Sequence, residues 1–183
     1  MKKLQLLFIG SLFIFNTTTA QKVFTKTGTI SFFSKTNMED IKAENSQVIS
    51  VLNIQSGELQ FSILIKSFHF EKALMEEHFN ENYLESEKFP KSTFKGLITN
   101  IAAINFTKDG TYNAVVTGDL TIHGSTQKIT TTGKIIISNG KVTAIAKFFI
   151  KLADYKVTIP KLVKDNISET QEITVTCLYN QKM

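Results

Sequence analysis

The residues that could do chemistry in this sequence are few, and their spacing gives no recognisable catalytic site. The histidines are His69, His78 and His123, and none lies in an H-E-x-x-H or comparable metal-binding spacing. No G-x-S-x-G motif surrounds any of the serines. Glu39 and Asp40 are adjacent, but their polar stretch offers no apolar surroundings to shift a carboxyl pKa. We therefore expect no catalytic residues, no metal site and no cofactor, and we interpret the protein as a non-enzyme.

Two alternatives stay open for the histidines. His78 lies near Glu77 and Glu81, so a bound cation is an alternative there to an ordinary solvated histidine. A hydrolase that uses His78 or His123 is the second alternative, which the lack of any nucleophile–base spacing disfavours.

The charge pattern argues against a nucleic-acid partner. The chain carries a formal charge of +5, and all of its basic residues are lysines. Arginine is the usual side chain for bidentate recognition of phosphate and guanine. Since the sequence has no arginine and its lysines are scattered, we expect no nucleic-acid binding. Cys177 is the single cysteine, and its place in an alternating segment indicates a buried apolar role.

Apolar residues alternate with polar ones over most of the chain, which is typical of strands with one buried face. Ser56-Gly57, Lys108-Asp109-Gly110 and Asn139-Gly140 separate alternating segments and indicate hairpin turns. Residues 38–43 are interpreted as a connector. The expected strands are residues 22–35, 47–54, 58–68, 92–101, 111–122, 128–137, 141–151 and 172–179.

About eight antiparallel strands of this kind form either a sandwich or a closed barrel. Gly96, Gly118 and Gly133 lie in the middle of apolar strand faces, where glycine permits bends and close approach. The Cys and Trp spacing of an immunoglobulin-like sandwich is absent from the sequence. The sequence therefore predicts an all-β chain folded as one antiparallel barrel.

One stretch breaks the alternation. Met75, Phe79 and Tyr83 recur at every fourth position, which predicts a short amphipathic helix inserted mid-chain. We expect this stretch to close at Phe89-Pro90, where proline prevents continuation. A single helix among strands is expected to cover an opening, so Phe79 and Tyr83 are interpreted as a gate over the barrel mouth. The alternative is that the two rings anchor the helix to the core.

The apolar faces of the expected strands converge inside such a barrel. A barrel of about eight strands is just wide enough for packed side chains or for one small ligand. Alternation alone leaves both a filled core and a hollow lumen open. The residues that we expect to line the lumen are Phe32, Leu59, Phe61, Ile63, Ile65, Phe94, Ile98, Val116, Leu120, Ile122, Ile135, Phe148 and Ile150.

The N-terminus has the organisation of a secretory signal peptide. Met1-Lys2-Lys3 is a basic start, and residues 4–15 form an apolar run before a short polar stretch. The apolar run is shorter than the ~20 residues that span a bilayer, which disfavours a membrane anchor. We expect cleavage after Ala20, so that residues 1–20 are the signal and 21–183 one domain without an integral membrane span. The mature protein is expected to be periplasmic or secreted.

Two motifs resemble the YceI-like family. They are His78 to Gly96, H-F-N-E-N-Y-L-E-S-E-K-F-P-K-S-T-F-K-G, and Val116 to Gly124, V-T-G-D-L-T-I-H-G. Thr27 to Phe32 is similar to the family's first strand, and the resemblance covers essentially the whole mature chain. It implies a secreted, lipocalin-like β-barrel that binds polyisoprenoid and other amphiphilic lipids. Residues 151–157 depart from the family's late strand because they keep Asp154 and an aromatic but lack its glycine.

The resemblance implies that the lumen binds or carries an amphiphilic isoprenoid-like lipid, of polyprenyl or quinone type, in the cell envelope. The residues alone leave a structural or stress-related barrel with a filled core as the alternative, with a hydrolase as a weaker one. Ile145 and Phe149 lie on the otherwise polar face of their strand, which leaves a homodimer open.

Overall fold

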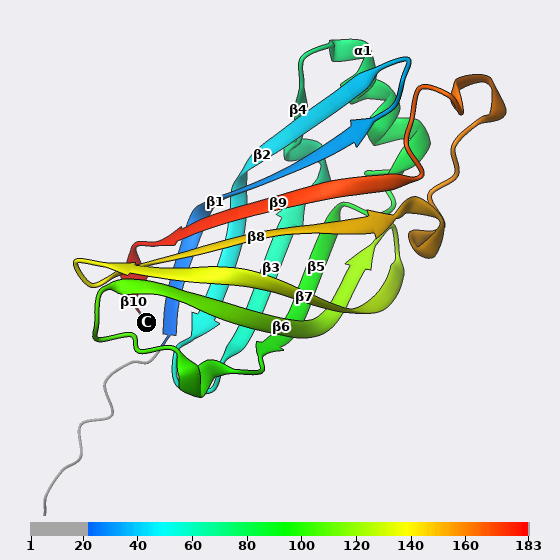
Figure 1. The fold of residues 1–183 in the computed structure, drawn as a ribbon. Helices are drawn as coiled ribbons and strands as arrows, with labels where there is room; N and C mark the ends of the chain where they lie inside the picture. The colour runs from blue at the N-terminus through cyan, green and yellow to red at the C-terminus, as the bar shows by residue number, and fades with distance from the viewer. Residues whose placement is uncertain (1–21, 183) are drawn as a thin grey trace, which may run out of the picture.

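The strands close into one antiparallel barrel, which confirms the predicted fold class. The computed structural model describes residues 22–182, so the expected signal peptide lies outside the described residues. The sheet runs in the order β1-β9-β8-β7-β6-β5-β3-β2, and β2 pairs back with β1 to close it (Figure 1). The barrel strands are β1 (Lys22–Lys35), β2 (Asp40–Asn53), β3 (Glu58–Leu64), β5 (Lys91–Ile98), β6 (Gly110–Ile122), β7 (Ser125–Ser138), β8 (Lys141–Lys151) and β9 (Thr170–Tyr179).

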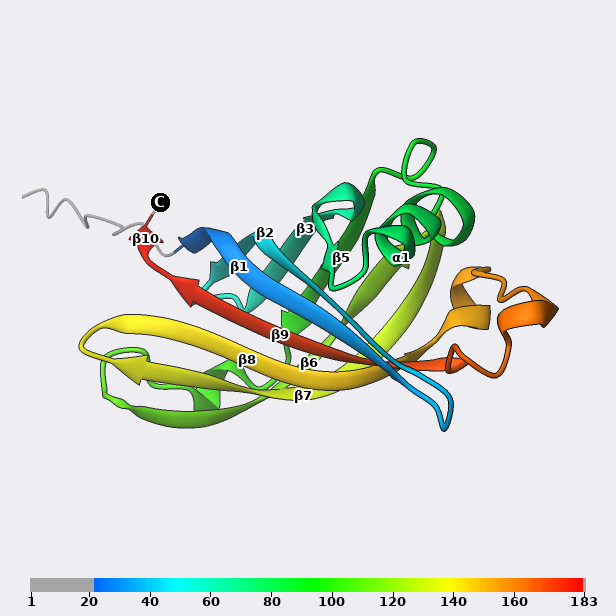
Figure 2. The ribbon, with the colours of Figure 1, turned by 90° about the horizontal axis from the view of Figure 1, so that it is seen from above.

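Short elements complete the fold. Helix α1 (Ala73–His78) continues into one π-helical turn, η2 (Phe79–Tyr83), and the pair lies at one end of the barrel (Figure 2). The strand β4 (His69–Phe70) pairs with β2, and β10 (Gln181–Lys182) pairs with β1. The 3-10 turns are η1 (Ile65–Ser67), η3 (Ile101–Ala103), η4 (Leu152–Tyr155) and η5 (Lys161–Val163).

Two-residue turns set the register of β6, β7 and β8. Asn139 and Gly140 both have positive φ, 50° and 72°, as a type I′ hairpin turn requires. His123 and Gly124 make the same kind of turn, with φ of 50° and 70°. Such turns match the twist of the flanking strands, so the inward alternation of β6 continues through β7 and β8.

The β1–β2 hairpin contains a bulge in each strand. The inward-facing positions shift by one residue after Thr25 in β1 and after Asn45 in β2. The N–H of Thr27 donates to Oγ1 of Thr25 (3.2 Å), and the N–H of Gln47 donates to Oδ1 of Asn45 (2.8 Å). Each buried polar side chain thus satisfies an amide near the bulge, and the hairpin can bend across the barrel.

The expected connector at residues 38–43 is wrong, because β2 already begins at Asp40. The chain reverses in a tight turn in which Oγ1 of Thr36 accepts the N–H of Glu39 at 3.0 Å. The inward residues at the start of β2 are Ile41, Ala43 and Asn45, of which one is small and one is polar. Only Ile41 is a large apolar residue among them, so the apolar alternation that indicates a strand is weak in this segment.

Two elements end earlier than the sequence predicted. The expected strand 58–68 stops at Leu64 and continues as η1 and β4, with the N–H of Ile65 donating to the carbonyl of Pro90 at 3.0 Å. The helical segment ends at Tyr83 rather than running towards Phe89-Pro90. Glu85 adopts a left-handed conformation with φ of 43°, which stops the helix before the proline is reached.

Two facing glycines make room for an aromatic ring inside the barrel. Gly96 on β5 is directly opposite Gly118 on β6. A methyl group added to Gly118 would lie 2.5 Å from Cα of Gly96 and 2.6 Å from the ring of Phe94. The close approach explains why these mid-strand positions lack a side chain, since any Cβ would collide with backbone as well as with the ring.

Gly118→Ala is therefore expected to destabilise the barrel by about 1–3 kcal/mol, because backbone of β5 must move to admit the methyl group. Gly110→Ala is the matched control on the same strand. The nearest atoms to a methyl group there would be those of the Tyr112 side chain at 3.5 Å, an ordinary contact. Urea unfolding of both variants measures the difference, and equal stabilities would contradict the packing described.

Candidate functional site

A cavity of about 350 Å³ occupies the barrel interior, within the range of about 300–1,000 Å³ of ligand pockets. Its wall is built from apolar side chains of every barrel strand. The residues expected to line the lumen all lie on this wall: Phe32, Leu59, Phe61, Ile63, Ile65, Phe94, Ile98, Val116, Leu120, Ile122, Ile135, Phe148 and Ile150. The two expected gate residues, Phe79 and Tyr83, lie on it as well.

The barrel end away from α1 is filled by side chains. Val23, Leu52, Ile137, Val142 and Tyr179 are buried in one cluster and do not belong to the cavity wall. They come from the starts of β1 and β8 and the ends of β2, β7 and β9, so they form a layer across the barrel. The interior is thus packed at one end and hollow towards the other, which we call the mouth.

Phe79 lies in a cluster of phenylalanine rings at the mouth. Its ring centroid is 5.5 Å from that of Phe32, 5.6 Å from Phe68 and 5.1 Å from Phe70. These separations are typical of favourable aromatic pairs. Phe79 therefore attaches the helical segment to β1 and β4 and at the same time forms part of the cavity wall.

The other end of the helical segment is held by Glu85 and His123. Nε2 of His123 donates to Oε2 of Glu85 across 2.6 Å, and this hydrogen bond holds the pKa of Glu85 below its ordinary value. Both residues have left-handed backbone conformations, which residues other than glycine rarely adopt. The contact therefore joins two strained turns, one after η2 and one between β6 and β7.

Phe89 reinforces this attachment. Its ring meets the His123 ring edge-on with centroids 4.6 Å apart, and a methyl group on Gly124 would lie 2.6 Å from it. Sequence reasoning placed Glu85 and His123 in two separate motifs and missed their contact. The reason is that nothing local to either motif identifies the other as its partner.

Glu39 joins three segments around the mouth. Its carboxylate accepts hydrogen bonds from Nζ of Lys72, before α1, at 2.8 Å and from Nδ2 of Asn166 at 3.3 Å. The Lys72 bond first, and the Asn166 bond second, lower the pKa of Glu39. Asn166 belongs to residues 156–168, which connect η4 to β9 and which we call the mouth loop. Sequence reasoning saw Glu39 only as a polar connector residue.

Gln171 brings an unpartnered acceptor to this region. The residue lines the cavity, is only 4% exposed, and donates from Nε2 to the carbonyl of Ser168 at 2.6 Å. Because a carbonyl can only accept, the amide orientation is fixed and Oε1 is the atom left over. Oε1 is buried and has no hydrogen-bond partner in the described structure. An orphan acceptor of this kind is costly unless some donor approaches it.

Two buried ionisable groups of the interior, Tyr155 and Cys177, are neutral near neutral pH. Burial raises the pKa of Tyr155, on the cavity wall, to about 12, helped by the charge of Asp154. Burial likewise raises the pKa of the free Cys177 thiol to about 12. Most of the wall is formed by apolar side chains, which favours an apolar occupant over a charged one.

The histidines do not converge on one site. His78 lies on the cavity wall, whereas Nδ1 of His69 is 3.6 Å from Oε2 of Glu76. Within residues 22–182, no group of three or more His, Cys, Asp or Glu side chains is arranged to hold a metal ion. Over the same residues, no helix is long and apolar enough to cross a bilayer.

Lowering the pH is expected to weaken the two carboxylate contacts that hold the helical segment, Glu39–Lys72 and Glu85–His123. The pKa values of Glu39 and Glu85 are lowered from an ordinary 4.5 by their partners. The stabilisation is therefore complete above the ordinary value and is lost as the pH falls through the lower folded-state pKa. We expect amides of residues 73–89 to exchange a few-fold faster at acid pH, relative to the barrel strands and after correction for intrinsic rates.

The double variant Glu39→Gln/Glu85→Gln should show part of this loosening already at neutral pH and a flatter response to acid. Glu58→Gln, an exposed carboxylate at the packed end, is the control and should behave like the wild type. Unchanged exchange in the double variant at neutral pH would contradict the role assigned to the two carboxylates.

Comparison with known proteins agrees with this architecture. A polyisoprenoid binding domain from Saccharophagus degradans, implicated in plant cell wall breakdown, superposes with a TM-score of 0.75 at 16% identity, over 87% of this chain and 98% of that chain. Burkholderia cenocepacia BcnA superposes with a TM-score of 0.64 at 16% identity, over 81% of this chain and 94% of that chain. At such identities the likeness shows the fold alone.

No curated protein matches the sequence. Residues 9–177 match the YceI-like domain, which confirms the resemblance of the two motifs. The chain therefore belongs to the YceI-like domain family.

Proposed function

We propose that the protein binds or carries an amphiphilic isoprenoid-like lipid, of polyprenyl or quinone type, in its lumen. The observation that supports this most is the apolar cavity of about 350 Å³, packed shut at one end and bordered by polar groups at the other. Burial of an acyl or prenyl chain contributes about 0.8 kcal/mol per CH₂ group, so a dry apolar wall suffices for affinity. The Saccharophagus relative described as polyisoprenoid binding adds support from within the fold.

The distribution of polar groups favours an amphiphile over a plain hydrocarbon. Glu39, Asn166 and Gln171 all lie on the wall of the cavity, and they belong to the segments around its mouth. A ligand with its chain in the lumen would leave its polar end among these groups. Ligand sites usually combine an apolar wall with a few polar groups in this way.

The two alternatives explain less of the structure. A barrel with a filled core accounts for the packed end but leaves the cavity without a role. A hydrolase that uses His123 would need this side chain at the cavity, yet its Nε2 is bonded to Glu85 and the residue does not line the wall. His78 does line the wall, but the sequence offers no nucleophile–base spacing for it.

Export of the protein is part of the proposal. We propose that residues 1–20 are a signal peptide cleaved after Ala20 and that the mature domain works in the periplasm or is secreted. Mass spectrometry of the protein from its own cell envelope is expected to find Gln21 as the first residue. A chain that retains Met1 would contradict cleavage.

Val116→Phe is expected to lower the affinity for a fluorescent prenyl lipid by about tenfold or more, because the added ring occupies the lumen. Val115→Phe is the matched control, since this neighbouring valine does not line the cavity. Titration with the fluorescent lipid, together with native mass spectrometry, measures binding. Equal affinities of the two variants would contradict a ligand site in the lumen.

The proposed gate has its own test. Phe79→Ala/Tyr83→Ala removes two side chains from the wall at the mouth, so lipid should exchange several-fold faster. Stopped-flow transfer of the same lipid to acceptor vesicles measures this rate, and thermal unfolding reports how much stability the aromatic cluster loses. Unchanged affinity and exchange in a folded variant would show that these rings only anchor the helix.

A further inference from the structure

The most exposed large apolar side chains gather at the mouth of the barrel. Leu162 is 95% exposed, Met38 72%, Phe149 65% and Leu74 61%, whereas the other exposed apolar residues lie between 36% and 45%. A single exposed leucine is ordinary on a soluble protein. Four exposed apolar side chains at the same end of the barrel, the end where the cavity lies, are less ordinary. They indicate a surface that contacts an apolar partner.

Contacts and views together place these side chains around the mouth. Met38 precedes Glu39, which bonds to Lys72 before α1 and to Asn166 of the mouth loop. The β1–β2 turn, α1 and the mouth loop lie at the same end of the barrel in both views (Figures 1 and 2). Phe149 is close to the end of β8, where η4 begins.

The mouth loop directs one apolar side chain into the lumen and another into solvent. Lys156 begins it in a left-handed conformation with φ of 57°, and Val157 is buried beside it. Pro160 then starts the turn η5. Within this turn Val163 lines the cavity, whereas Leu162 is almost fully exposed. The exposed residue is thus directly attached to the wall of the lumen.

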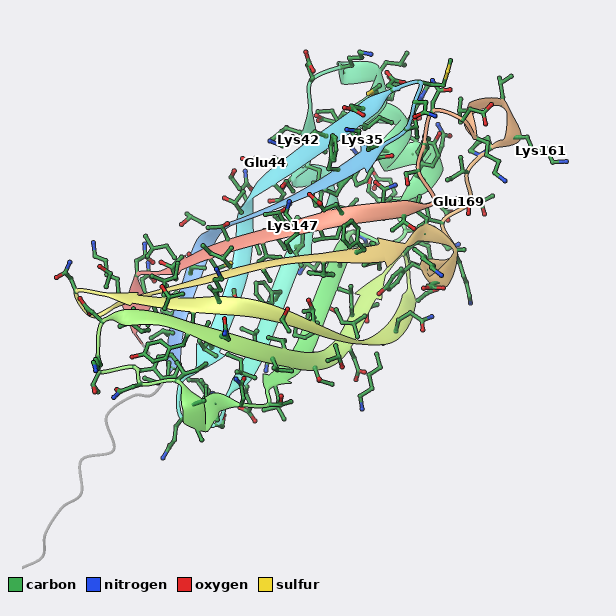
Figure 3. The ribbon with its side chains drawn as sticks, viewed as in Figure 1. Lys35, Lys42, Glu44, Lys147, Lys161 and Glu169 are labelled. Carbon is green, nitrogen blue, oxygen red and sulfur yellow. The ribbon has the colours of Figure 1, made fainter. Side chains whose placement is uncertain are left out.

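Charge distinguishes the mouth loop from the helix beside it. The mouth loop contains three lysines, Lys156, Lys161 and Lys164, against one acidic residue, Asp165, whereas α1 contains Glu76 and Glu77 and no lysine. Lys161 lies at the outermost point of the loop (Figure 3). Lys164 also pairs with Glu169 at 3.4 Å, so the loop tip is the more basic part. Lysines around an exposed leucine complement an anionic surface with an apolar interior.

We propose that the mouth loop docks the barrel on a bilayer that contains anionic phospholipid. Leu162 inserts among the acyl chains, the lysines of the loop contact lipid phosphates, and the mouth opens towards the membrane. A bilayer fits better than a protein partner because the apolar tips stand on separate segments between charged residues rather than forming one groove. This inference rests on the proposed lipid-binding function, since it describes how the lipid reaches the lumen.

Vesicle flotation of the processed protein tests the docking surface. Vesicles of phosphatidylethanolamine with phosphatidylglycerol are expected to bind the wild type, and vesicles of phosphatidylcholine alone to bind it several-fold less. Leu162→Asp should lower partitioning to the anionic vesicles by about tenfold or more. Leu178→Asp, a leucine 44% exposed near the packed end, is the matched control and should stay within about twofold of the wild type.

The charge contribution is measured with Lys161→Gln against Lys141→Gln, which lies in the β7–β8 turn region at the packed end. Lys161→Gln should weaken binding to anionic vesicles by roughly fivefold and reduce its dependence on salt, while Lys141→Gln should do neither. A wild type that does not float, or a Leu178→Asp variant that loses as much binding as Leu162→Asp, would overturn the proposal.

The lumen variant separates this inference from the proposed function. Val116→Phe should float like the wild type while failing to bind the fluorescent prenyl lipid in solution. Leu162→Asp should bind that lipid in solution normally but load it from vesicles about tenfold more slowly. Vesicle binding that depends on Leu162 without any prenyl-lipid binding would support the docking surface and contradict the cargo. Prenyl-lipid binding without Leu162-dependent vesicle binding would contradict the docking surface alone.

Discussion

The closure of the sheet at β1 is the constraint on which the rest of the structure depends. A barrel removes exposed edges only if its first strand finds partners on both sides, and β1 pairs with β2 on one side and with β9 and β10 on the other. The bulges after Thr25 and Asn45 let the β1–β2 hairpin bend into that position. The bulges place two polar side chains, those of Thr25 and Asn45, in the interior. The cost of burying them is offset because each accepts a hydrogen bond from a nearby backbone N–H.

A barrel closed in this way has a fixed interior, and the side chains decide how much of it is filled. At the packed end large residues such as Leu52 and Tyr179 are buried in one cluster. Farther along, the wall includes small residues such as Ala144 and Ala146, and the cavity remains. The aromatic cluster around Phe79 and the Glu85–His123 contact then hold one helical segment across the hollow end. One chain thus combines a packed base with a mouth held by fewer contacts, which agrees with the proposed binding of a ligand in the lumen.

The sequence predicted the regular part of the fold and the wall of the cavity, because both depend on local alternation. Leu120 and Ile122 face inward two residues apart, and Asn139-Gly140 forms the turn that its composition indicates. Prediction from the sequence failed where a bulge shifts the alternation, as after Asn45 in β2. It also failed where partners are distant in sequence, because Glu39 meets Asn166 only after the barrel has closed. The extent of filling could not be predicted either, since it depends on which inward side chains meet across the axis.

The position of Cys177 has a consequence for where this fold can work. The thiol is fully buried against Gly28, where an added methyl group would lie 2.5 Å from Sγ, and its pKa is raised to about 12. A protonated, inaccessible thiol neither attacks a disulfide nor presents itself to an oxidant. The sequence offers no second cysteine for an internal bridge. Because the folded barrel buries its thiol and can form no internal disulfide, its stability does not depend on the redox potential around it.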